Sequence, residues 1–185
     1  KSSHKVRYNS NKRNHNISSL CFGDNEDEVF YSTNQKISKD TGRNISPLKI
    51  YHSISKDGKW DDGVQIISLE NDHINYAHPF YDEKSQRLYF TSNMDGGIGG
   101  MDIYFTQKNG DSWSKPINAG KGVNTDGNEA FPSFYNNTLY FSSDRRAGLG
   151  GYDIFSSRNL NESFQTAENL KMPINNKSDD FGFTF

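Results

Sequence analysis

The sequence predicts an all-β protein, a β-propeller built from four-stranded antiparallel blades. The first observation is an internal repeat, because residues 88–106 and 139–157 are offset by 51 residues and agree at nine of nineteen positions. Repetition at such a period is typical of solenoids, propellers and arrays. The second observation is composition, since 14% of the residues are aromatic and aromatic side chains favour strands over helices. Each copy holds an apolar run, a glycine-rich turn and a second apolar run, which predicts two strands joined by a tight loop.

Three units of this kind follow one another, and each is expected to contribute four antiparallel strands. First strands are predicted at residues 19–22, 77–80 and 130–134, second strands at 28–32, 88–92 and 139–143, and third strands from Ile50, Ile103 and Ile154 onward. A hairpin turn then leads to an aromatic residue that we expect to pack between blades, namely Trp60, Trp113 or Phe164. Asp-Gly and Asn-Gly at the first two hairpins tolerate the positive φ angles that tight turns need. Short fourth strands follow at residues 64–67, 116–119 and 167–170.

The repeat divides the chain into five segments. Residues 1–14 are a basic linker or the end of a preceding blade, residues 15–73, 74–124 and 125–175 are blades, and residues 176–185 are the first strand of a further blade. Propellers generally have four to eight blades. About three blades with flanking strands therefore form an arc of a larger propeller, for which six blades are expected. The fragments Ile74-Asn75, Val123-Asn124 and Ile174-Asn175 look like copies of one connection between blades.

Charge and cysteine content limit the functions that the chain can have. The net charge of −2 gives no reason to expect nucleic acid or an anionic membrane as a partner. Residues 1–16 are basic and could bind nucleic acid or lipid headgroups, although a solvated tail or linker is the simpler interpretation. The single cysteine, Cys21, forms no intramolecular disulfide and is expected to be a buried core thiol rather than a reactive one. No apolar run approaches the ~18 residues of a transmembrane helix.

The glycine-rich turns are predicted to have a structural role. Gly99, Gly100, Gly150 and Gly151 are expected to supply positive φ angles and to let a neighbouring strand approach closely. The alternative is a cradle for phosphate. Phosphate-binding loops usually lead into a helix, whereas a strand follows these turns.

Asp102 and Asp153 begin the third strand at equivalent positions in two units. Each carboxylate is expected to accept hydrogen bonds from backbone N–H groups of its glycine turn and so to fix that turn. Metal binding is the alternative, because hard cations prefer carboxylates, but each unit offers only one such Asp. In the first unit Lys49 replaces the Asp and the loop is longer, so this blade must fasten its turn differently.

The repeats leave few singular residues that could carry chemistry. Arg145 and Arg146 stand where the preceding unit has Met94 and Asp95, which makes this turn a candidate contact for a carboxylate or a partner protein. A variable turn that faces solvent is the alternative. The five histidines form no metal-binding pair on a helix, and no Gly-x-Ser-x-Gly motif is present. We therefore predict no catalytic residue, no cofactor and no metal site, and hence a protein that is not an enzyme.

The repeat resembles a known family. The run Leu-Tyr-Phe-Ser-Ser-Asp at 139–144, followed by Gly-Leu-Gly-Gly-Tyr-Asp-Ile-Phe at 148–155, resembles the TolB-type β-propeller repeat of bacterial envelope proteins. The resemblance covers nearly all of residues 15–185 and is strongest over 74–185. The order of the units is similar to that of propellers in OmpA-family proteins of the Bacteroidetes, which include PorE-like proteins of type IX secretion. Lys49 and its long loop depart from the pattern.

This resemblance implies a periplasmic protein that is associated with the outer membrane. It implies a non-enzymatic scaffold that binds other envelope proteins, with no membrane insertion by these residues and with peptidoglycan contact only through domains outside them. The alternative is a glycan-binding or glycoside-hydrolase-like propeller, because the turn at 56–60 and the hairpin of Trp113 resemble the Asp-box turns of sialidases. A glycosidase needs two carboxylates at a set separation, and the sequence picks out no such pair.

Overall fold

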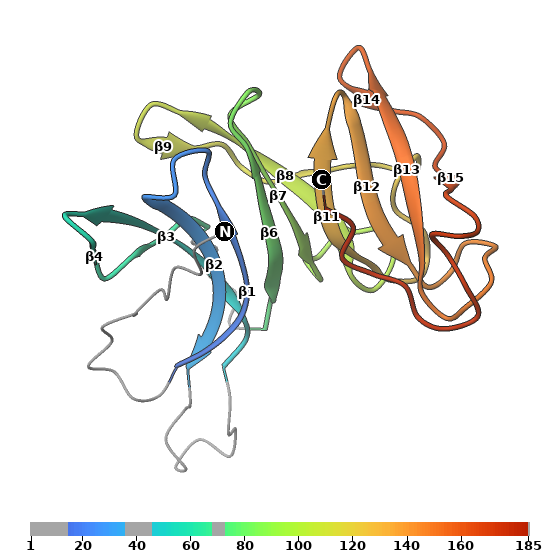
Figure 1. The fold of residues 1–185 in the computed structure, drawn as a ribbon, viewed down its shortest axis with the longest axis horizontal. Helices are drawn as coiled ribbons and strands as arrows, with labels where there is room; N and C mark the ends of the chain where they lie inside the picture. Colours follow the sequence, from blue (N-terminus) through green and yellow to red (C-terminus); the bar gives the residue numbers. More distant parts are fainter. Residues whose placement is uncertain (1–14, 36–45, 68–72, 185) are drawn as a thin grey trace.

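The computed structural model of the protein describes residues 15–35, 46–67 and 73–184. The regular elements in these ranges are β-strands, which form three antiparallel sheets (Figure 1). The sheets follow one another as a fan, with β6 packed between β1 and β11, and we name them the first, second and third blades. The predicted all-β architecture, an arc of propeller blades, is confirmed. Within the same ranges the structure has no helix able to span a lipid bilayer.

Each blade contains three long strands and two short ones. The first blade consists of β1 (His15–Phe22), β2 (Glu28–Gln35), β3 (Lys49–Lys56), β4 (Lys59–Trp60) and β5 (Val64–Gln65). The second consists of β6 (Tyr76–Asp82), β7 (Arg87–Ser92), β8 (Asp102–Asn109), β9 (Ser112–Trp113) and β10 (Ile117–Asn118). The third consists of β11 (Glu129–Tyr135), β12 (Thr138–Ser143), β13 (Asp153–Leu160), β14 (Ser163–Phe164) and β15 (Glu168–Asn169). The long strands pair in chain order within each blade.

The outer edge of each blade is formed by two short strands that both pair with the third long strand. In the second blade, for example, β9 and β10 both pair with β8. The sequence predicts the later of the two short strands, and the structure adds a hairpin strand that carries the aromatic residue. The hairpins use positive φ angles as expected, with 53° at Asp57 and 74° at Gly58.

A β-bulge interrupts the first strand of every blade. The register between the first and second strands shifts in all three blades. His78 and Phe131 lie in the bulges of the second and third blades with φ angles of 50° and 51°, a conformation that non-glycine residues rarely adopt. Their rings stack with centroids 3.8 Å apart. The bulges thus bring the first strands of neighbouring blades into direct contact.

Apolar cores lie between successive blades rather than within one blade. The core between the first and second blades includes Phe30, Ile50, Tyr76, Leu88 and Phe90. The core between the second and third includes Tyr89, Ile103, Val123, Leu139 and Phe141. Neighbouring blades cover β7 on both faces, so it is buried from its second residue to its last. This explains why the second strands show no strict alternation of polar and apolar residues.

The first strand of the first blade is less buried than its sequence predicts. Ile17, Leu20 and Phe22 are 44%, 48% and 38% exposed, and the ring of Trp60 lies 6.3 Å from that of Phe22, whereas β6 packs along the other side of β1. Cys21 is half-buried rather than a core residue, and burial raises the pKa of its thiol. The predicted linker at residues 1–14 lies outside the described residues.

Residues 176–184 follow the third blade and pack against it. They belong to no strand in the part of the chain that the structure describes, although the sequence predicts that a further first strand begins there. The backbone N–H of Asp180 donates to the carbonyl of Tyr152 at 2.8 Å. The ring of Phe183 stacks on that of Tyr140 with centroids 5.0 Å apart.

Candidate ligand-binding site

The predicted turn glycines lie where two backbones approach closely. A Cβ atom on Gly99 would overlap the carbonyl oxygens of Thr125 and Gly127, and one on Gly150 would overlap the carbonyl oxygen of Ser178. The close contact is made by the connection to the next blade, not by a neighbouring strand. None of the predicted turn glycines has a positive φ angle, and they are Gly99, Gly100, Gly150 and Gly151. Close approach therefore explains these glycines, whereas the expected left-handed conformation does not.

Both predicted aspartates face the N–H groups of their own turns. Asp102, which is 1% exposed, accepts hydrogen bonds from the N–H groups of Ile98 at 2.5 Å and Gly99 at 3.0 Å. Asp153 accepts from the equivalent Leu149 at 2.7 Å. In the described ranges no three His, Cys, Asp or Glu side chains are grouped so that they could hold a metal ion. Each carboxylate thus accepts from two backbone N–H groups of its own turn, which fits turn fixation.

In the first blade, Lys49 occupies the place of the aspartate and makes a different contact. Its ammonium group donates to the carbonyl of Ile74 at 3.0 Å and lies 5.1 Å from the ring centroid of Tyr76. The lysine therefore ties its strand to the connection that leads into the second blade. This contact is how the blade with the irregular turn is fastened.

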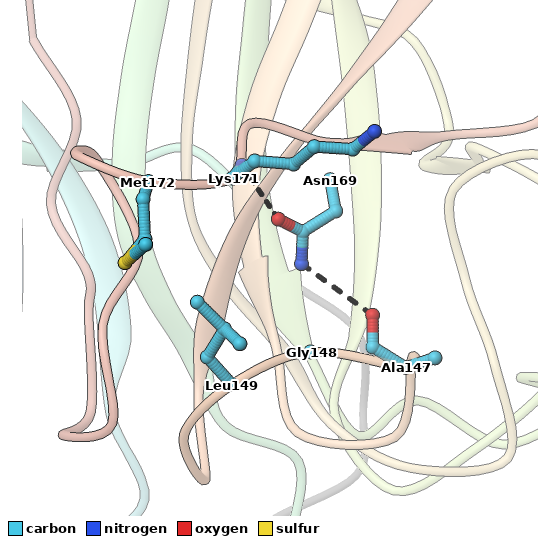
Figure 2. A pocket seen from close by; sticks show the side chains of 6 residues that line it. All are labelled: Ala147, Gly148, Leu149, Asn169, Lys171 and Met172. Carbon is cyan, nitrogen blue, oxygen red and sulfur yellow. Dashed lines mark hydrogen bonds between the residues drawn. The ribbon is translucent and has the colours of Figure 1, made fainter.

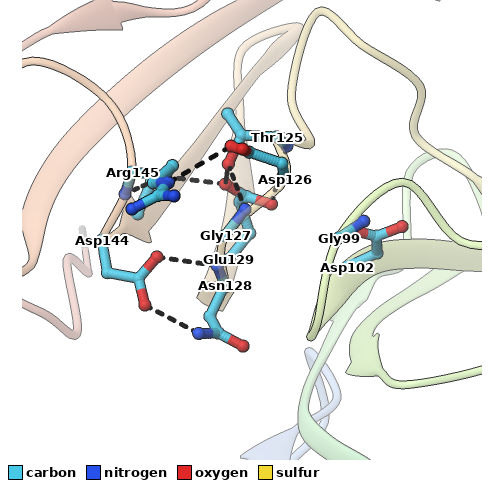
Figure 3. Close-up of polar contacts among 10 residues, drawn as sticks. Gly99, Asp102, Thr125, Asp126, Gly127, Asn128, Glu129, Asp144 and Arg145 are labelled. Atoms are coloured by element: carbon cyan, nitrogen blue, oxygen red, sulfur yellow. Dashed lines mark hydrogen bonds and ion pairs between the residues drawn. The ribbon is translucent and has the colours of Figure 1, made fainter.

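Side-chain amides and carboxylates join each blade to the next, and the sequence does not reveal this. Asn128 accepts from the N–H of Met101 at 3.0 Å, and both its backbone and side-chain N–H groups donate to Asp144 at 2.7 Å (Figure 3). Asn75 accepts in the same way from Leu48 at 3.0 Å.

This geometry separates fragments that look alike in the sequence. Asn124 and Asn175 each bind the N–H and the carbonyl of one third-strand residue, Ile103 and Ile154 respectively. Asn75 instead takes the position of Asn128. The three Asn-containing fragments are therefore not copies of one connection, because the first of them aligns with a later residue of the other two.

A cleft of about 480 Å³ lies at the rim of the third blade, beside Arg145. Arg145 is exposed, and its Nε lies 3.4 Å from the carboxylate of Asp126 (Figure 3). Asp144, Tyr152 and Asp179 also line the cleft. Burial and the nearby charge of Asp144 raise the pKa of Tyr152. The cleft offers hydrogen-bonding groups and one exposed cation on a surface that is otherwise acidic.

Glu129 lies next to this cleft but is fully buried. Its carboxylate accepts from the N–H and hydroxyl of Thr125 at 3.0 and 2.6 Å and from the hydroxyl of Ser143 at 2.7 Å. Burial raises the pKa of Glu129. These three donors offset much of the cost of burying the carboxylate, so Glu129 anchors the start of β11 rather than facing a ligand.

Arg146 does not project into solvent, unlike the adjacent Arg145. Its guanidinium donates to the carbonyls of Gly122 at 3.0 Å and Val123 at 2.8 Å, and it lies 5.9 Å from the ring centroid of Phe141. Burial lowers its pKa. Arg146 therefore joins the second and third blades and is not available as a partner contact. Of the residues at the equivalent earlier turn, Met94 packs on the first core and Asp95 is exposed.

A second hollow lies beside the glycine turn of the third blade (Figure 2). It measures about 490 Å³, and its apolar lining comes mainly from Leu149 and Met172, which are 49% and 74% exposed. Asn169 accepts from the N–H of Lys171 at 2.6 Å and donates to Ala147 at 3.4 Å. Because the Asn169 amide is already bonded to backbone groups and most of the lining is apolar, this hollow offers little to orient a ligand.

A third pocket, of about 420 Å³, opens at the junction between the first and second blades. We call it the junction pocket. Its apolar lining comes from Ile54, Val64, Ile66 and the indole of Trp113, and its polar lining comes from His52, Gln65, Lys108, Asp111 and Ser112. Trp113 meets the rings of Phe30 and Tyr81 edge-on at 6.0 Å. Trp113 thus packs between blades as predicted and, in addition, faces a pocket.

A charged cluster forms one side of the junction pocket. A carboxylate oxygen of Glu28 lies 2.7 Å from Nε2 of His52 and 3.4 Å from Nζ of Lys108. The imidazole stacks on Phe30 with centroids 4.7 Å apart, and Nζ of Lys108 lies 5.9 Å from the Trp113 ring. Glu28 and His52 belong to the first blade, whereas Lys108 and Trp113 belong to the second. The cluster therefore exists only where the two blades meet.

The junction between the second and third blades is filled at the equivalent positions. Arg87 forms an ion pair with Glu162 and lies 4.8 Å from the ring centroid of Phe105. Phe164, which corresponds to Trp113, is 8% exposed. In the strand registers, Arg87, Phe105 and Glu162 correspond to Glu28, His52 and Asp111. The junction pocket is thus a departure from the repeat, and aligning the sequence copies alone does not expose it.

No protein-family model matches the chain, and no curated protein matches it. A prolyl endopeptidase structure shares 12% identity with a TM-score of 0.53 and covers 90% of this chain. A puromycin-hydrolysing peptidase of Mycobacterium tuberculosis shares 13% identity with a TM-score of 0.57 over 85% of this chain. The chain spans only 22% and 24% of these two peptidases. An α-L-arabinofuranosidase from Lactobacillus brevis shares 14% identity, with a TM-score of 0.49, over 84% of this chain and 56% of its own.

These comparisons correct one prediction. The absence of an unrepeated catalytic group predicts a protein that is not an enzyme, but two solved proteins of similar fold are peptidases. The fold therefore gives no ground for excluding enzymatic activity. What the peptidase likenesses do show is the β-propeller fold itself.

Proposed function

We propose that this chain is part of a β-propeller that binds carbohydrate in the junction pocket. The observation that carries the proposal is an indole wall, Trp113, set beside hydrogen-bonding side chains from two blades. A sugar ring presents C–H groups on its faces and hydroxyls at its edge, so it suits a pocket with one aromatic wall and a few polar groups. His52, Gln65 and Lys108 supply both donors and acceptors there.

The charges around the junction pocket favour a neutral sugar. Lys108 is balanced by Glu28 at 3.4 Å, and Asp111 adds a negative charge to the lining. An anionic ligand would meet an excess of carboxylate and would be repelled. Two carboxylates at one junction also make hydrolysis of a bound sugar a reaction worth measuring, since glycosidases use such pairs.

The test uses the folded chain and a panel of neutral oligosaccharides. Titration calorimetry measures their binding, and release of reducing ends measures their hydrolysis. Trp113→Ala should lower the affinity at least about tenfold, because the aromatic wall is lost. Trp60→Ala is the matched control, since Trp60 holds the same hairpin position in the first blade and lies outside the pocket lining. Equal loss in both variants, or no sugar bound by the wild type, would contradict the proposal.

We also propose that the protein works in the bacterial cell envelope, associated with the outer membrane and bound to other envelope proteins. Support comes from the resemblance of residues 139–155 to the TolB-type repeat and from the exposed pair of Arg145 and Asp126 at the rim. Arg145→Glu should weaken capture of envelope partners in pull-downs from native cells while leaving sugar binding unchanged. Recovery of the native protein from the cytoplasm, with unchanged capture, would contradict this proposal.

A further inference from the structure

The hairpin that carries Trp113 also contains the only Asn-Gly pair of the sequence, Asn109-Gly110. Asn109 is the last residue of β8, and Gly110 begins the turn into β9 (Figure 1). The peptide nitrogen that follows an asparagine can attack the side-chain amide of that asparagine. A glycine at the following position hinders this attack least, because it has no Cβ atom.

Both residues of the pair are accessible. Asn109 and Gly110 are exposed, and within the described residues the Asn109 side chain makes no hydrogen bond. Its amide is therefore free to turn toward the nitrogen of Gly110. A Cβ atom on Gly110 would meet no atom within 4 Å, so the five-membered ring that the attack creates has room to form.

A neighbouring hydroxyl activates the attacking nitrogen. The side chain of Ser112 donates to the carbonyl of Asn109 at 3.0 Å. This carbonyl and the N–H of Gly110 belong to one peptide bond, whose electrons are delocalised between oxygen and nitrogen. A donor at the oxygen draws electron density away from the nitrogen, so the N–H of Gly110 loses its proton more readily.

The hairpin of the third blade provides an internal comparison. Asn161 is also exposed and lies at the tip of that hairpin with a φ angle of 51°. The next residue is Glu162, whose side chain hinders attack by its own peptide nitrogen. Among the described residues no hydroxyl donates to the carbonyl of Asn161. Of the two hairpin asparagines, Asn109 is therefore the reactive one.

We propose that Asn109 deamidates spontaneously and that its isoaspartate product removes Trp113 from the junction pocket. The deprotonated nitrogen of Gly110 bonds to Cγ of Asn109, the bond from Cγ to the amide nitrogen breaks, and ammonia leaves. Water then opens the resulting succinimide. Attack of water at Cγ gives aspartate, and attack at the main-chain carbonyl gives isoaspartate. One water is consumed and one ammonia is released, with no oxidation or reduction.

The isoaspartate product lengthens the backbone by one methylene at the last paired residue of β8. Asn109 pairs there with Ser112, and Lys108 pairs with Trp113. Turn length fixes the register of a hairpin, so the two-residue strand β9 loses its pairing when the connection grows. Lys108, Asp111, Ser112 and Trp113 all line the junction pocket. The resulting loss of sugar binding is the part of this inference that rests on the proposed function.

The first experiment ages the full chain at mildly alkaline pH and locates modified residues by peptide mass spectrometry. Labelling with an isoaspartyl methyltransferase distinguishes isoaspartate from aspartate. Modification at Asn109 should be at least about tenfold faster than at Asn161. Ser112→Ala should slow it by about two- to tenfold, because the donor to the carbonyl is lost. Lys115→Ala, an exposed position just beyond β9, is the control and should leave the rate unchanged.

The second experiment compares the purified isoaspartate form with the unaged chain. In a Trp60→Phe background Trp113 is the only tryptophan, so its fluorescence reports the position of the indole. We expect a shift of that emission and faster hydrogen exchange in β9. The isoaspartate form should bind a neutral oligosaccharide at least about tenfold more weakly than the unaged chain. Asn109→Asp adds the charge without lengthening the backbone and should stay within about twofold of the wild type.

Two outcomes would overturn the proposal. Equal modification of Asn109 and Asn161 in the aged chain would show that the hairpin of Trp113 is not the assigned site. An isoaspartate form with unchanged Trp113 fluorescence and unchanged exchange in β9 would show that the hairpin tolerates the longer backbone. If the unaged chain binds no sugar, the proposed function fails, whereas the mass and fluorescence measurements still decide this inference.

Discussion

At the junction between the first and second blades, Glu28 holds His52 and Lys108 around an open pocket, whereas at the next junction Arg87 pairs with Glu162 and covers Phe105. The backbone registers at the two junctions are the same. The aromatic triads also correspond, with Phe30, Tyr81 and Trp113 at one junction and Tyr89, Phe134 and Phe164 at the other. The difference lies in four positions above a shared aromatic base, which are Glu28, His52, Lys108 and Asp111 at the first junction and Arg87, Phe105, Asn159 and Glu162 at the second.

This difference indicates where function can develop in a repeat protein. The aromatic base holds the blades together at both junctions, so its residues are constrained by packing. The polar positions above it are free to close the junction, as Arg87 does, or to leave space for a ligand. A site in such a fold is therefore found by asking where equivalent positions differ, rather than by searching for a catalytic motif.

The largest expected effect comes from removing a ring at the base of a junction. Phe30→Ala should lower the free energy of unfolding by about 3 to 5 kcal/mol, because Phe30 is fully buried against Tyr81 and His52. Tyr89→Ala at the second junction should cost a similar amount. Only Phe30→Ala should also abolish sugar binding. Urea denaturation measures the free energy of unfolding of both variants. A loss below about 1 kcal/mol for either would contradict the claim that the aromatic base stabilises both junctions.

Arg146→Ala should have the next largest effect. We expect a loss of about 2 to 3 kcal/mol in the free energy of unfolding, because its guanidinium donates to two carbonyls of the second blade in a partly buried site. Arg145→Ala is the matched control and should change stability by less than about 0.5 kcal/mol, since that side chain is exposed. If both variants unfold at the same urea concentration, Arg146 does not fasten the second junction.

These two arginines show what the sequence could predict and what it could not. Strand order, hairpins and the split of the chain into blades follow from local patterns, because turn residues and apolar runs act over a few positions. The side chain of Arg146 points into the junction because it donates to the carbonyls of residues 122 and 123, and no local sequence pattern places those carbonyls beside it. The junction pocket was missed for the same reason, since Glu28, His52 and Lys108 meet only after two blades pack.

A smaller effect concerns acid stability at the bulges. Burial lowers the pKa of His78 to about 4, below the value of about 6.5 expected in the unfolded chain. The unfolded state therefore binds the proton first, and stability should fall as the pH drops from about 6.5 toward 4. His78→Phe places the same residue type in the second bulge that Phe131 provides in the third blade. Between pH 6.5 and 5 the wild type should lose at most about 2 kcal/mol more of its free energy of unfolding than this variant. Urea midpoints at several pH values test this, and equal acid sensitivity of the two proteins would contradict it.

The most direct test converts one junction into the other. In Glu28→Arg/His52→Phe/Lys108→Asn/Asp111→Glu, the polar positions of the first junction carry the residues of the second, which should fill the junction pocket while keeping the aromatic base. Circular dichroism and urea denaturation establish that the variant folds. Calorimetric titration with the same neutral oligosaccharide then measures the affinity of both proteins. We expect the wild type to bind the oligosaccharide and the folded variant to bind it at least about tenfold more weakly. Equal affinity in the two proteins would contradict a ligand site at this junction.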